Sequence, residues 1–395
     1  MLTALVLTTA LAMTQPPCGS HAMAPAVCAT TQGVWVTWLE PVSKAEPTKA
    51  SEIWRLRISR FDGVSWTSPH TITQRQDFFI NWADTPQIAA APDGALIATW
   101  LQKNGSGTYA YDIGVARSDD AGKSWTMLGT LNDDRTQTEH GFVSMAPEAE
   151  GVRVIWLDGR AMVSGEHEEH GHAGGDMSLR TTMITDTIQP STLLDNRTCE
   201  CCPTAMTESS AGMLIAYRDR LPSERRDISV VRLTDNGWTS PKDLWTDGWE
   251  INGCPVNGPA AASNGLRTAV VWYTGAENPG VRAAISEDGG MTFDEPITLA
   301  GEEALGRVAV AWPSDNNPVA IWIDEDDSSH GNATLALASL GDADVTAKHI
   351  ATLEAGRGSG YPRIAALPDG RCLVIWTSKA REEGLRAHLI DISED

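Results

Sequence analysis

A short hairpin pattern recurs seven times along the chain and restricts its possible folds more than any other feature. Each copy has small apolar residues, a turn with glycine or asparagine, and a β-rich run that ends on an aromatic residue. The copies lie at residues 24–38, 85–100, 145–156, 202–217, 257–272, 306–322 and 361–376. They end on Trp38, Trp100, Trp156, Tyr217, Trp272, Trp322 and Trp376. The spacing of these aromatics, roughly 50 to 62 residues, is typical of propeller blades.

Each copy predicts a hairpin of two strands, because a turn separates two β-rich runs. Two further strand-like runs follow, for example at 111–118 and 123–131 in the second unit. The unit is therefore a four-stranded antiparallel blade, whose strands we call A to D in chain order. The seventh unit reaches Asp395 without a D strand. The prediction is an all-β, seven-bladed propeller, with a six-bladed ring and a β-sandwich as the alternatives.

Charge and hydropathy limit the partners and the location. The formal net charge of −22 argues against nucleic acid and anionic membranes. Residues 2–12 are apolar and resemble a signal-peptide core cut after Ala12 or Ala22, although no Lys or Arg precedes Lys44. The same run could instead form the outer strand of a blade. No other segment is apolar enough for a transmembrane helix. We expect a signal-like segment at 1–22, a single propeller domain at 23–395, and a periplasmic or secreted protein.

Two eight-residue segments carry a recurrent turn motif. SDDAGKSW (118–125) and SEDGGMTF (286–293) both fit S-x-D-x-G-x-T-W, within the tolerance of such patterns. Asp120 and Asp288 are expected to accept hydrogen bonds from backbone amides of the turn. Trp125 and Phe293 are expected to pack between neighbouring sheets.

This motif resembles the Asp-box of the sialidase superfamily, and the resemblance covers nearly the whole chain at the level of fold. It implies an exo-glycosidase with an arginine triad, a Tyr–Glu nucleophile pair and an Asp acid/base. The first blade lacks the arginine motif of that family, and the usual sialidase has six blades. The residues that could take these catalytic roles are Tyr361, Arg218, Arg307 and Arg363.

Antiparallel strand order predicts which loops share a rim of the propeller. D-to-A and B-to-C connections share one rim, and A-to-B and C-to-D turns share the other. The D-to-A connections lie nearest the axis and are expected to line the channel mouth. Two consecutive D-to-A connections hold Cys199, Cys201, Cys202 and Cys254, and the B-to-C loop 164–177 holds His167, His170 and His172. Other D-to-A connections add Cys18, His21, Met23, His140 and Met145.

Thiolate, imidazole and thioether ligands together suit soft or borderline metals such as copper(I) or zinc(II). The predicted metal ligands are Cys199, Cys201, Cys202, Cys254, His167, His170 and His172. A disulfide from Cys201 or Cys202 to Cys254 is the structural alternative. Cys28 and Cys372 are interpreted as buried apolar residues or as a staple between the first and last blades.

The sequence therefore predicts an exported propeller that binds copper or zinc, or does redox or binding work, at its channel mouth. Its partners would be a metal ion or small ligand there, or a protein. A sialidase-like glycoside hydrolase is the first alternative function. A disulfide-stapled scaffold for protein partners is the second.

Overall fold

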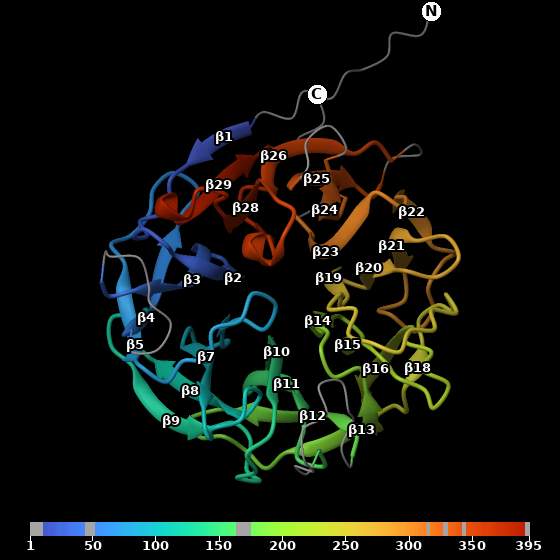
Figure 1. Cartoon of the computed structure of the whole chain (residues 1–395), viewed down its shortest axis with the longest axis horizontal. Coiled ribbons are helices and arrows are strands. Elements are labelled where there is room, and N and C mark those ends of the chain that lie inside the picture. The colour runs from blue at the N-terminus through green and yellow to red at the C-terminus, as the bar shows by residue number, and fades with distance from the viewer. Residues whose placement is uncertain are drawn as a thin grey trace, which may run out of the picture.

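The computed structural model describes residues 11–43, 52–162, 175–313, 317–326, 331–341 and 345–391. Within these residues the chain forms seven antiparallel sheets arranged as blades around a central axis (Figure 1). The seven-bladed prediction is confirmed, and the six-bladed and sandwich alternatives are wrong. Blade 4 differs from the others in having its outer strand split in two. The described residues contain no helix that is long and apolar enough to cross a membrane.

The first four blades contain the following strands. Blade 1 has β2 (Met23–Thr30), β3 (Gly33–Pro41), β4 (Trp54–Phe61) and β5 (His70–Arg75). Blade 2 has β6 (Gln87–Ala90), β7 (Leu96–Lys103), β8 (Tyr111–Ser118) and β9 (Thr126–Thr130). Blade 3 has β10 (His140–Glu148), β11 (Gly151–Asp158), β12 (Met177–Ile184) and β13 (Thr192–Thr198). Blade 4 has β14 (Ala205–Ser209), β15 (Gly212–Arg218), β16 (Ile228–Thr234), β17 (Gly237–Trp238) and β18 (Lys242–Asp243).

The remaining blades complete the ring. Blade 5 has β19 (Ala260–Asn264), β20 (Arg267–Thr274), β21 (Gly280–Ser286) and β22 (Ile297–Ala300). Blade 6 has β23 (Ala304–Ala311), β24 (Val319–Glu325), β25 (Asn332–Ser339) and β26 (Lys348–Glu354). Blade 7 has β27 (Arg363–Ala366), β28 (Cys372–Thr377), β29 (Leu385–Ile390) and β1 (Leu11–Thr14). Two 3-10 helices, η1 (Arg357–Ser359) and η2 (Arg381–Glu383), lie in the connections of blade 7.

The outer strand of blade 7 comes from the other end of the chain. β1 pairs antiparallel with β29, with Leu11 opposite Ile390 and Thr14 opposite Ala387 (Figure 1). The D strand that the seventh repeat lacks is thus supplied by residues 11–14. The expectation of an outer strand is realised for Leu11 and Ala12, and the rest of the run 2–12 lies outside the described residues.

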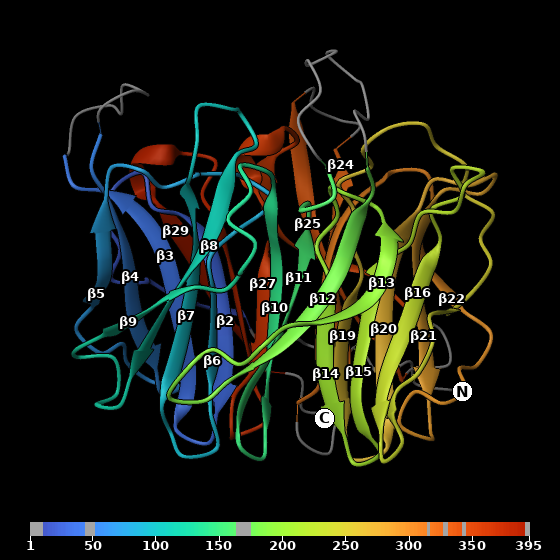
Figure 2. The same cartoon turned by 90° about the horizontal axis from the view of Figure 1, so that it is seen from below.

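Strand direction places the two sets of loops on opposite rims, as the repeat predicts (Figure 2). On one rim, Arg226 of a B-to-C connection contacts Cys199 of a D-to-A connection. On the other, Arg117 at the end of β8 forms an ion pair at 2.9 Å with Asp93 of an A-to-B turn. The A strands line the axis and enclose a cavity of about 190 Å³, lined by residues from all seven blades.

The two Asp-boxes form as predicted. Asp120 accepts hydrogen bonds from the amides of Lys123 at 3.0 Å and Ser124 at 2.8 Å. Asp288 does the same for Met291 and Thr292, at 2.9 and 2.8 Å. Their aromatic residues pack where two blades meet, Trp125 with blades 1 and 2 and Phe293 with blades 4 and 5. Hydrogen bonding of the ionised form lowers the pKa of Asp120 to about 2.

The aromatic residue that ends each repeat is the main buried group of its blade. Trp38, Trp156, Trp272 and Trp322 have no solvent exposure. Three of these indoles donate to an acid two residues later on the same strand: Trp38 to Glu40 at 2.8 Å, Trp156 to Asp158 at 2.7 Å, and Trp322 to Asp324 at 2.7 Å. Residues i and i+2 of a strand face the same side, so the carboxylate reaches the indole without leaving the blade.

Trp100 shows how tightly these aromatic residues are packed. It pairs across the strands with Gly114, and a Cβ on Gly114 would lie 2.4 Å from the indole. Position 114 requires glycine because the indole of Trp100 occupies the space that a side chain would need.

We therefore expect Gly114→Ala to lower the free energy of unfolding by about 1–3 kcal/mol through overpacking. Denaturant unfolding measures this. Gly107→Ala is the matched control, because its Cβ would meet only the methyl group of Ala110, at 3.4 Å. Equal stability of the two variants would contradict the packing argument.

Candidate functional site

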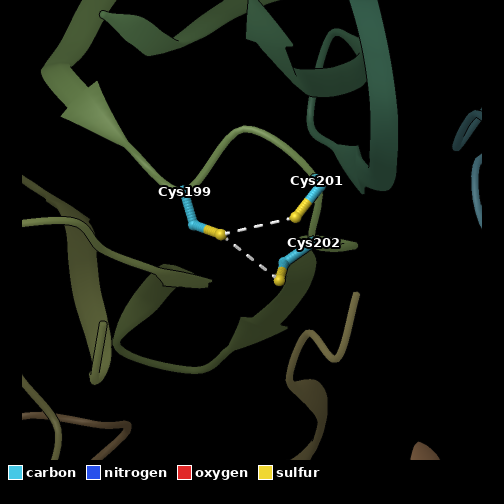
Figure 3. A group of neighbouring side chains, drawn as sticks. All are labelled: Cys199, Cys201 and Cys202. Atoms are coloured by element: carbon cyan, nitrogen blue, oxygen red, sulfur yellow. Dashed lines mark hydrogen bonds between the residues drawn. The ribbon is translucent and has the colours of Figure 1, made fainter. Parts of the chain in front are cut away.

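Three cysteine side chains converge in the connection between β13 and β14 (Figure 3). The Sγ atom of Cys199 lies 3.8 Å from that of Cys201 and 3.5 Å from that of Cys202. All three sulfur atoms lie within 4.8 Å of one another. Zinc–thiolate bonds of about 2.3 Å in a tetrahedral site would separate their sulfurs by about 3.8 Å. The spacing of these thiols therefore suits a shared soft metal ion.

Backbone contacts bring a second cysteine-bearing loop beside the first. The amide of Cys199 donates to the carbonyl of Arg218 at 3.1 Å. Gly258, at the start of blade 5, approaches Pro203 so closely that a Cβ there would lie 1.8 Å from the Pro203 carbonyl oxygen. The loop that precedes Gly258 carries Cys254, which is exposed to solvent. A hydrogen bond with Cys201, opposed by burial, lowers the pKa of Cys254.

A buried guanidinium faces the cysteines. Arg226 has no solvent exposure, and its Nη1 lies 3.2 Å from Sγ of Cys199 and 3.0 Å from Oε2 of Glu200. Its Nη2 donates to Glu224 at 2.9 Å, so two carboxylates hold it in place. Sequence analysis missed Arg226 and Glu200. Arg226 lies on a B-to-C connection, and the shared rim was the only signal that could have suggested it.

The four thiols differ in their readiness to ionise. Burial alone would raise the pKa of Cys199, but hydrogen bonds from Cys201 and Cys202 and the charge of Arg226 hold it well below its usual range. Hydrogen bonding to Cys199 raises the pKa of Cys201, and burial raises that of Cys202. Cys199 is therefore the most readily ionised of these thiols, with the thiols of Cys201 and Cys202 beside it.

Other candidate ligands either lie outside the described residues or are engaged elsewhere. His167, His170 and His172 lie outside the described residues. Cys18 accepts a hydrogen bond from the amide of Leu385 at 3.3 Å and packs where blades 1 and 7 meet. All seven cysteines are free thiols, so the disulfide to Cys254 is absent from this structure.

Cys28 and Cys372 do not staple the ring. Cys28 packs against the core between blades 1 and 2, whereas Cys372 packs against the core between blades 6 and 7. Cys372 is a buried apolar residue, as one of the two interpretations had it.

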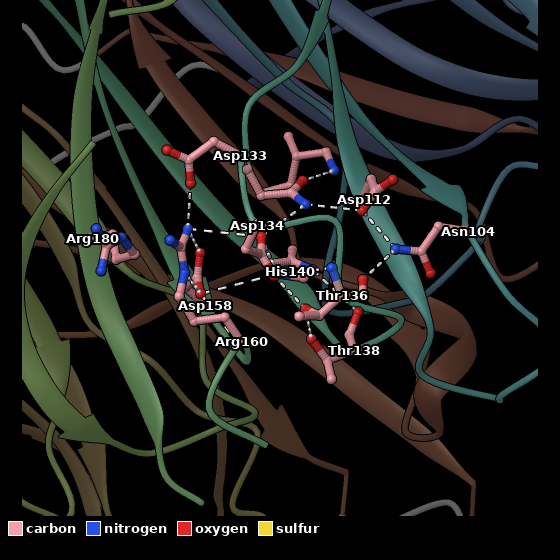
Figure 4. Close-up of polar contacts among 12 residues, drawn as sticks. Asn104, Asp112, Asp133, Asp134, Thr136, Thr138, His140, Asp158, Arg160 and Arg180 are labelled. Carbon is pink, nitrogen blue, oxygen red and sulfur yellow. Dashed lines mark hydrogen bonds and ion pairs between the residues drawn. The ribbon is translucent and has the colours of Figure 1, made fainter. Parts of the chain in front are cut away.

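A second group of ligand-type side chains lies at the mouth of blade 3 (Figure 4). His140 Nδ1 lies 3.1 Å from the carbonyl oxygens of both Tyr111 and Thr138, and Nε2 lies 3.1 Å from Asp134. Every one of these neighbours is an acceptor, so both ring nitrogens must carry a proton. Burial lowers the pKa of His140, but the hydrogen bond and charge of Asp134, with the charge of Asp158, raise it overall. This group is a buried, protonated imidazole of His140 held by hydrogen bonds on both ring nitrogens.

The residues predicted as catalytic form hydrogen bonds that join the loops at the mouth of the channel. Tyr361 is buried, and its hydroxyl donates to the carbonyl of Val256 at 2.6 Å. The three arginines bind different loops: Arg218 donates to the carbonyls of Asn257, Arg226 and Tyr273, Arg307 to Ser359 and Gly356, and Arg363 to Thr85 and Pro25. These contacts do not converge on one point where a substrate carboxylate would sit.

Two further acids share one phenol. The hydroxyl oxygen of Tyr111 lies 2.7 Å from Oε1 of Glu139 and 3.2 Å from Oδ2 of Asp84. A phenol has one proton, so one of the two carboxyl groups must be protonated. Burial raises the pKa of Asp84 to about 7 and, with the charges of Asp84 and Glu200, that of Glu139 to about 8. Glu200, which lies between Cys199 and Cys201 in the chain, acts on Glu139 through its charge.

This pair predicts a pH-dependent stability. Because its pKa is raised, Asp84 keeps its proton in the folded state over a pH range in which the unfolded chain, with the ordinary pKa of 3.8, has released it. The stabilisation is present below about pH 4 and is lost as the pH rises to about 7. Asp84→Asn keeps the acceptor for the amide of Phe142 and cannot titrate.

We expect the stability of wild type to fall relative to Asp84→Asn across that range, by at most roughly 1.4 kcal/mol per pH unit. Urea unfolding at a series of pH values measures the difference. Parallel curves for the two proteins would show that Asp84 is not protonated in the folded state.

Several solved structures match the chain over most of its length. A protein of unknown function from Dyadobacter fermentans DSM 18053 is 14% identical, with a TM-score of 0.50, over 98% of this chain and 100% of that one. An ulvan lyase, a polysaccharide lyase, is 9% identical with a TM-score of 0.57, over 96% of each chain. At such identities the similarity shows the fold alone. A search of curated proteins finds no match.

The family profile that matches is that of the BNR repeat-like domain, over residues 35–374. This range runs from the first blade into the last and includes both Asp-boxes. The match covers most of the chain, and it agrees with the sevenfold repeat and the motif geometry. The chain belongs to the BNR repeat-like domain family.

Proposed function

We propose that the chain is an exported propeller that binds a soft metal ion, copper(I) or zinc(II), through Cys199, Cys201, Cys202 and Cys254. The observation that carries the proposal is the position of three thiols, with Sγ of Cys199 3.8 Å from that of Cys201 and 3.5 Å from that of Cys202. Cys254 lies on the neighbouring loop. Sulfur ligands in this number select copper(I) and zinc(II) over harder cations.

The electrostatics of the pocket support the same conclusion. A thiolate–metal complex carries net negative charge once several thiolates have bound. Arg226 is buried against Cys199 and cannot turn to solvent, because Glu200 and Glu224 hold its guanidinium. It therefore offsets the charge of the complex. Cys199, whose pKa is lowered, is also the thiol most ready to lose the proton that metal binding displaces.

The metal proposal predicts one bound equivalent per chain and a loss of affinity of more than about 100-fold in Cys199→Ser, since even outer-shell changes cost 10- to 100-fold. Reduced protein is titrated with zinc(II) or copper(I) against a chromophoric chelator. Cys28→Ser is the control, because Cys28 lies on an inner strand far from the cluster core. No uptake by wild type, or equal uptake by Cys199→Ser, would overturn the proposal.

Metal removal should also lower stability. A ligand that binds only the folded state adds roughly 2.7 kcal/mol at 100 times its Kd. We therefore expect a chelator to lower the Tm of the loaded wild type and to leave that of Cys199→Ser unchanged. A Tm that does not respond to chelator in either protein would contradict the assignment.

Export is supported by the apolar run at 2–12 and is tested by the mature N-terminus. A cut after Ala22 would remove β1 and leave β29 without its outer neighbour, whereas a cut after Ala12 would keep Met13 and Thr14. N-terminal sequencing of the protein from the periplasm or medium distinguishes the two. Retention of the full run in cytoplasmic protein only would contradict export.

The alternative functions give different results in simple assays. Release of a fluorophore from a sialoside reporter, lost in Arg363→Ala, would support a glycoside hydrolase. Failure of both metal uptake and hydrolysis would leave a scaffold for protein partners. The contacts of Arg218, Arg307 and Arg363 with separate mouth loops favour the metal assignment over the hydrolase.

A further inference from the structure

The four thiols form an ordered series from solvent to the protein interior. Cys254 is exposed, Cys201 is partly buried, and Cys199 and Cys202 are buried. Cys201 lies between the two ends of the series: its Sγ lies 3.8 Å from that of Cys199, and its side chain interacts with that of Cys254. The four thiols are therefore arranged in order from the surface to the buried pair.

Resting on the proposed metal binding, we infer that Cys254 is the entry ligand, which takes copper(I) from a sulfur-bearing carrier and passes it through Cys201 to Cys199 and Cys202. Copper(I) binds sulfur ligands strongly, so a carrier presents it already bound to thiolate. Transfer then needs a receiving sulfur that can approach the donor. Cys199 and Cys202 have at most 1% exposure and cannot do this.

The entry loop is anchored in a fixed conformation. Val256, two residues after Cys254, has φ of 47°, which a β-branched residue rarely adopts. Its carbonyl accepts a hydrogen bond of 2.6 Å from the buried hydroxyl of Tyr361. Strained backbone of this kind persists where surrounding contacts enforce it. The thiol of Cys254 is thus held at the rim, on the loop that leads into the close contact of Gly258 with Pro203.

The interior end of the series is the stronger site. Arg226 contacts Cys199 at 3.2 Å, and both are buried away from competing water. The fixed positive charge stabilises thiolate ligands there more than at the solvent-exposed Cys254, where water screens it. Copper(I) is expected to move inward for this reason.

The transfer involves ligand exchange only. Copper remains copper(I), and the bond to the carrier sulfur breaks as the bond to Sγ of Cys254 forms. The same exchange then follows at Cys201, Cys199 and Cys202. Each thiol that becomes a ligand gives its proton to the departing thiolate or to buffer, so no oxidant or reductant is needed.

The test compares rate with affinity. Copper(I) bound to glutathione is mixed with reduced wild type, Cys254→Ser and the control Cys28→Ser, and the copper–thiolate ultraviolet band is followed by stopped flow. Equilibrium affinity is measured separately against bathocuproine disulfonate. We expect Cys254→Ser to load at least about tenfold more slowly, a change within the range of on-rates among variants of one site. Its affinity should stay well above that of Cys199→Ser.

The outcomes separate the inference from the proposed function. Loading of Cys254→Ser at the wild-type rate would overturn the entry role while metal binding stands. Loss of affinity as complete as in Cys199→Ser would make Cys254 an ordinary ligand and would also overturn it. Wild type that takes no copper(I) would overturn the proposed function itself. Cys254→Ala, with the same predicted rate, guards against an effect specific to the serine hydroxyl.

Discussion

The propeller depends on burying the tryptophans that end its repeats. The N–H group of each buried indole must keep a hydrogen-bond acceptor. A buried donor without a partner costs about 1–3 kcal/mol, and the chain would meet this cost in blade after blade. In blades 1, 3 and 6 the acceptor is an acid two residues further along the same strand. In each of these blades the indole N–H group therefore finds its acceptor on its own strand. In blade 5 the acceptor of Trp272 comes instead from Asp247, on the connection that precedes the blade, at 2.7 Å.

This arrangement explains why so much of the fold could be predicted and where prediction stopped. The hairpin that ends on an aromatic residue recurs in every repeat, and two repeats add an Asp-box, so each blade could be recognised from local sequence. Contacts across the ring leave no such mark. The apolar run 2–12 suggests an outer strand and the seventh unit lacks one, but no local pattern identifies 385–390 as its partner. Likewise, nothing in Arg225-Arg226 shows that Arg226 turns inward to Cys199 while Arg225 pairs with Asp243.

The site was predictable as a location and only partly as a set of residues. Strand order alone places the Cys199–Cys202 loop and the Cys254 loop on neighbouring blades at one rim. It does not show that Cys18 and His140 would be engaged by other partners, Cys18 by the amide of Leu385 and His140 by Asp134. The charge beside the cysteines is opposite in sign to the net charge of the chain. A chain with net charge −22 keeps a guanidinium beside its thiols, so the overall acidity attracts cations while the pocket itself favours anionic sulfur.

The pairing of β1 with β29 has a consequence for the order in which the molecule is made. The first strand of the described chain, β1, has its partner β29 among the last described residues. Contacts so distant in sequence form slowly, because a very long loop must close before they contribute. During synthesis the growing array of blades has open sheet edges at both ends, and such edges promote aggregation. The ring cannot close before both β1 and β29 have been made, so the open edges persist until synthesis has reached the last blade.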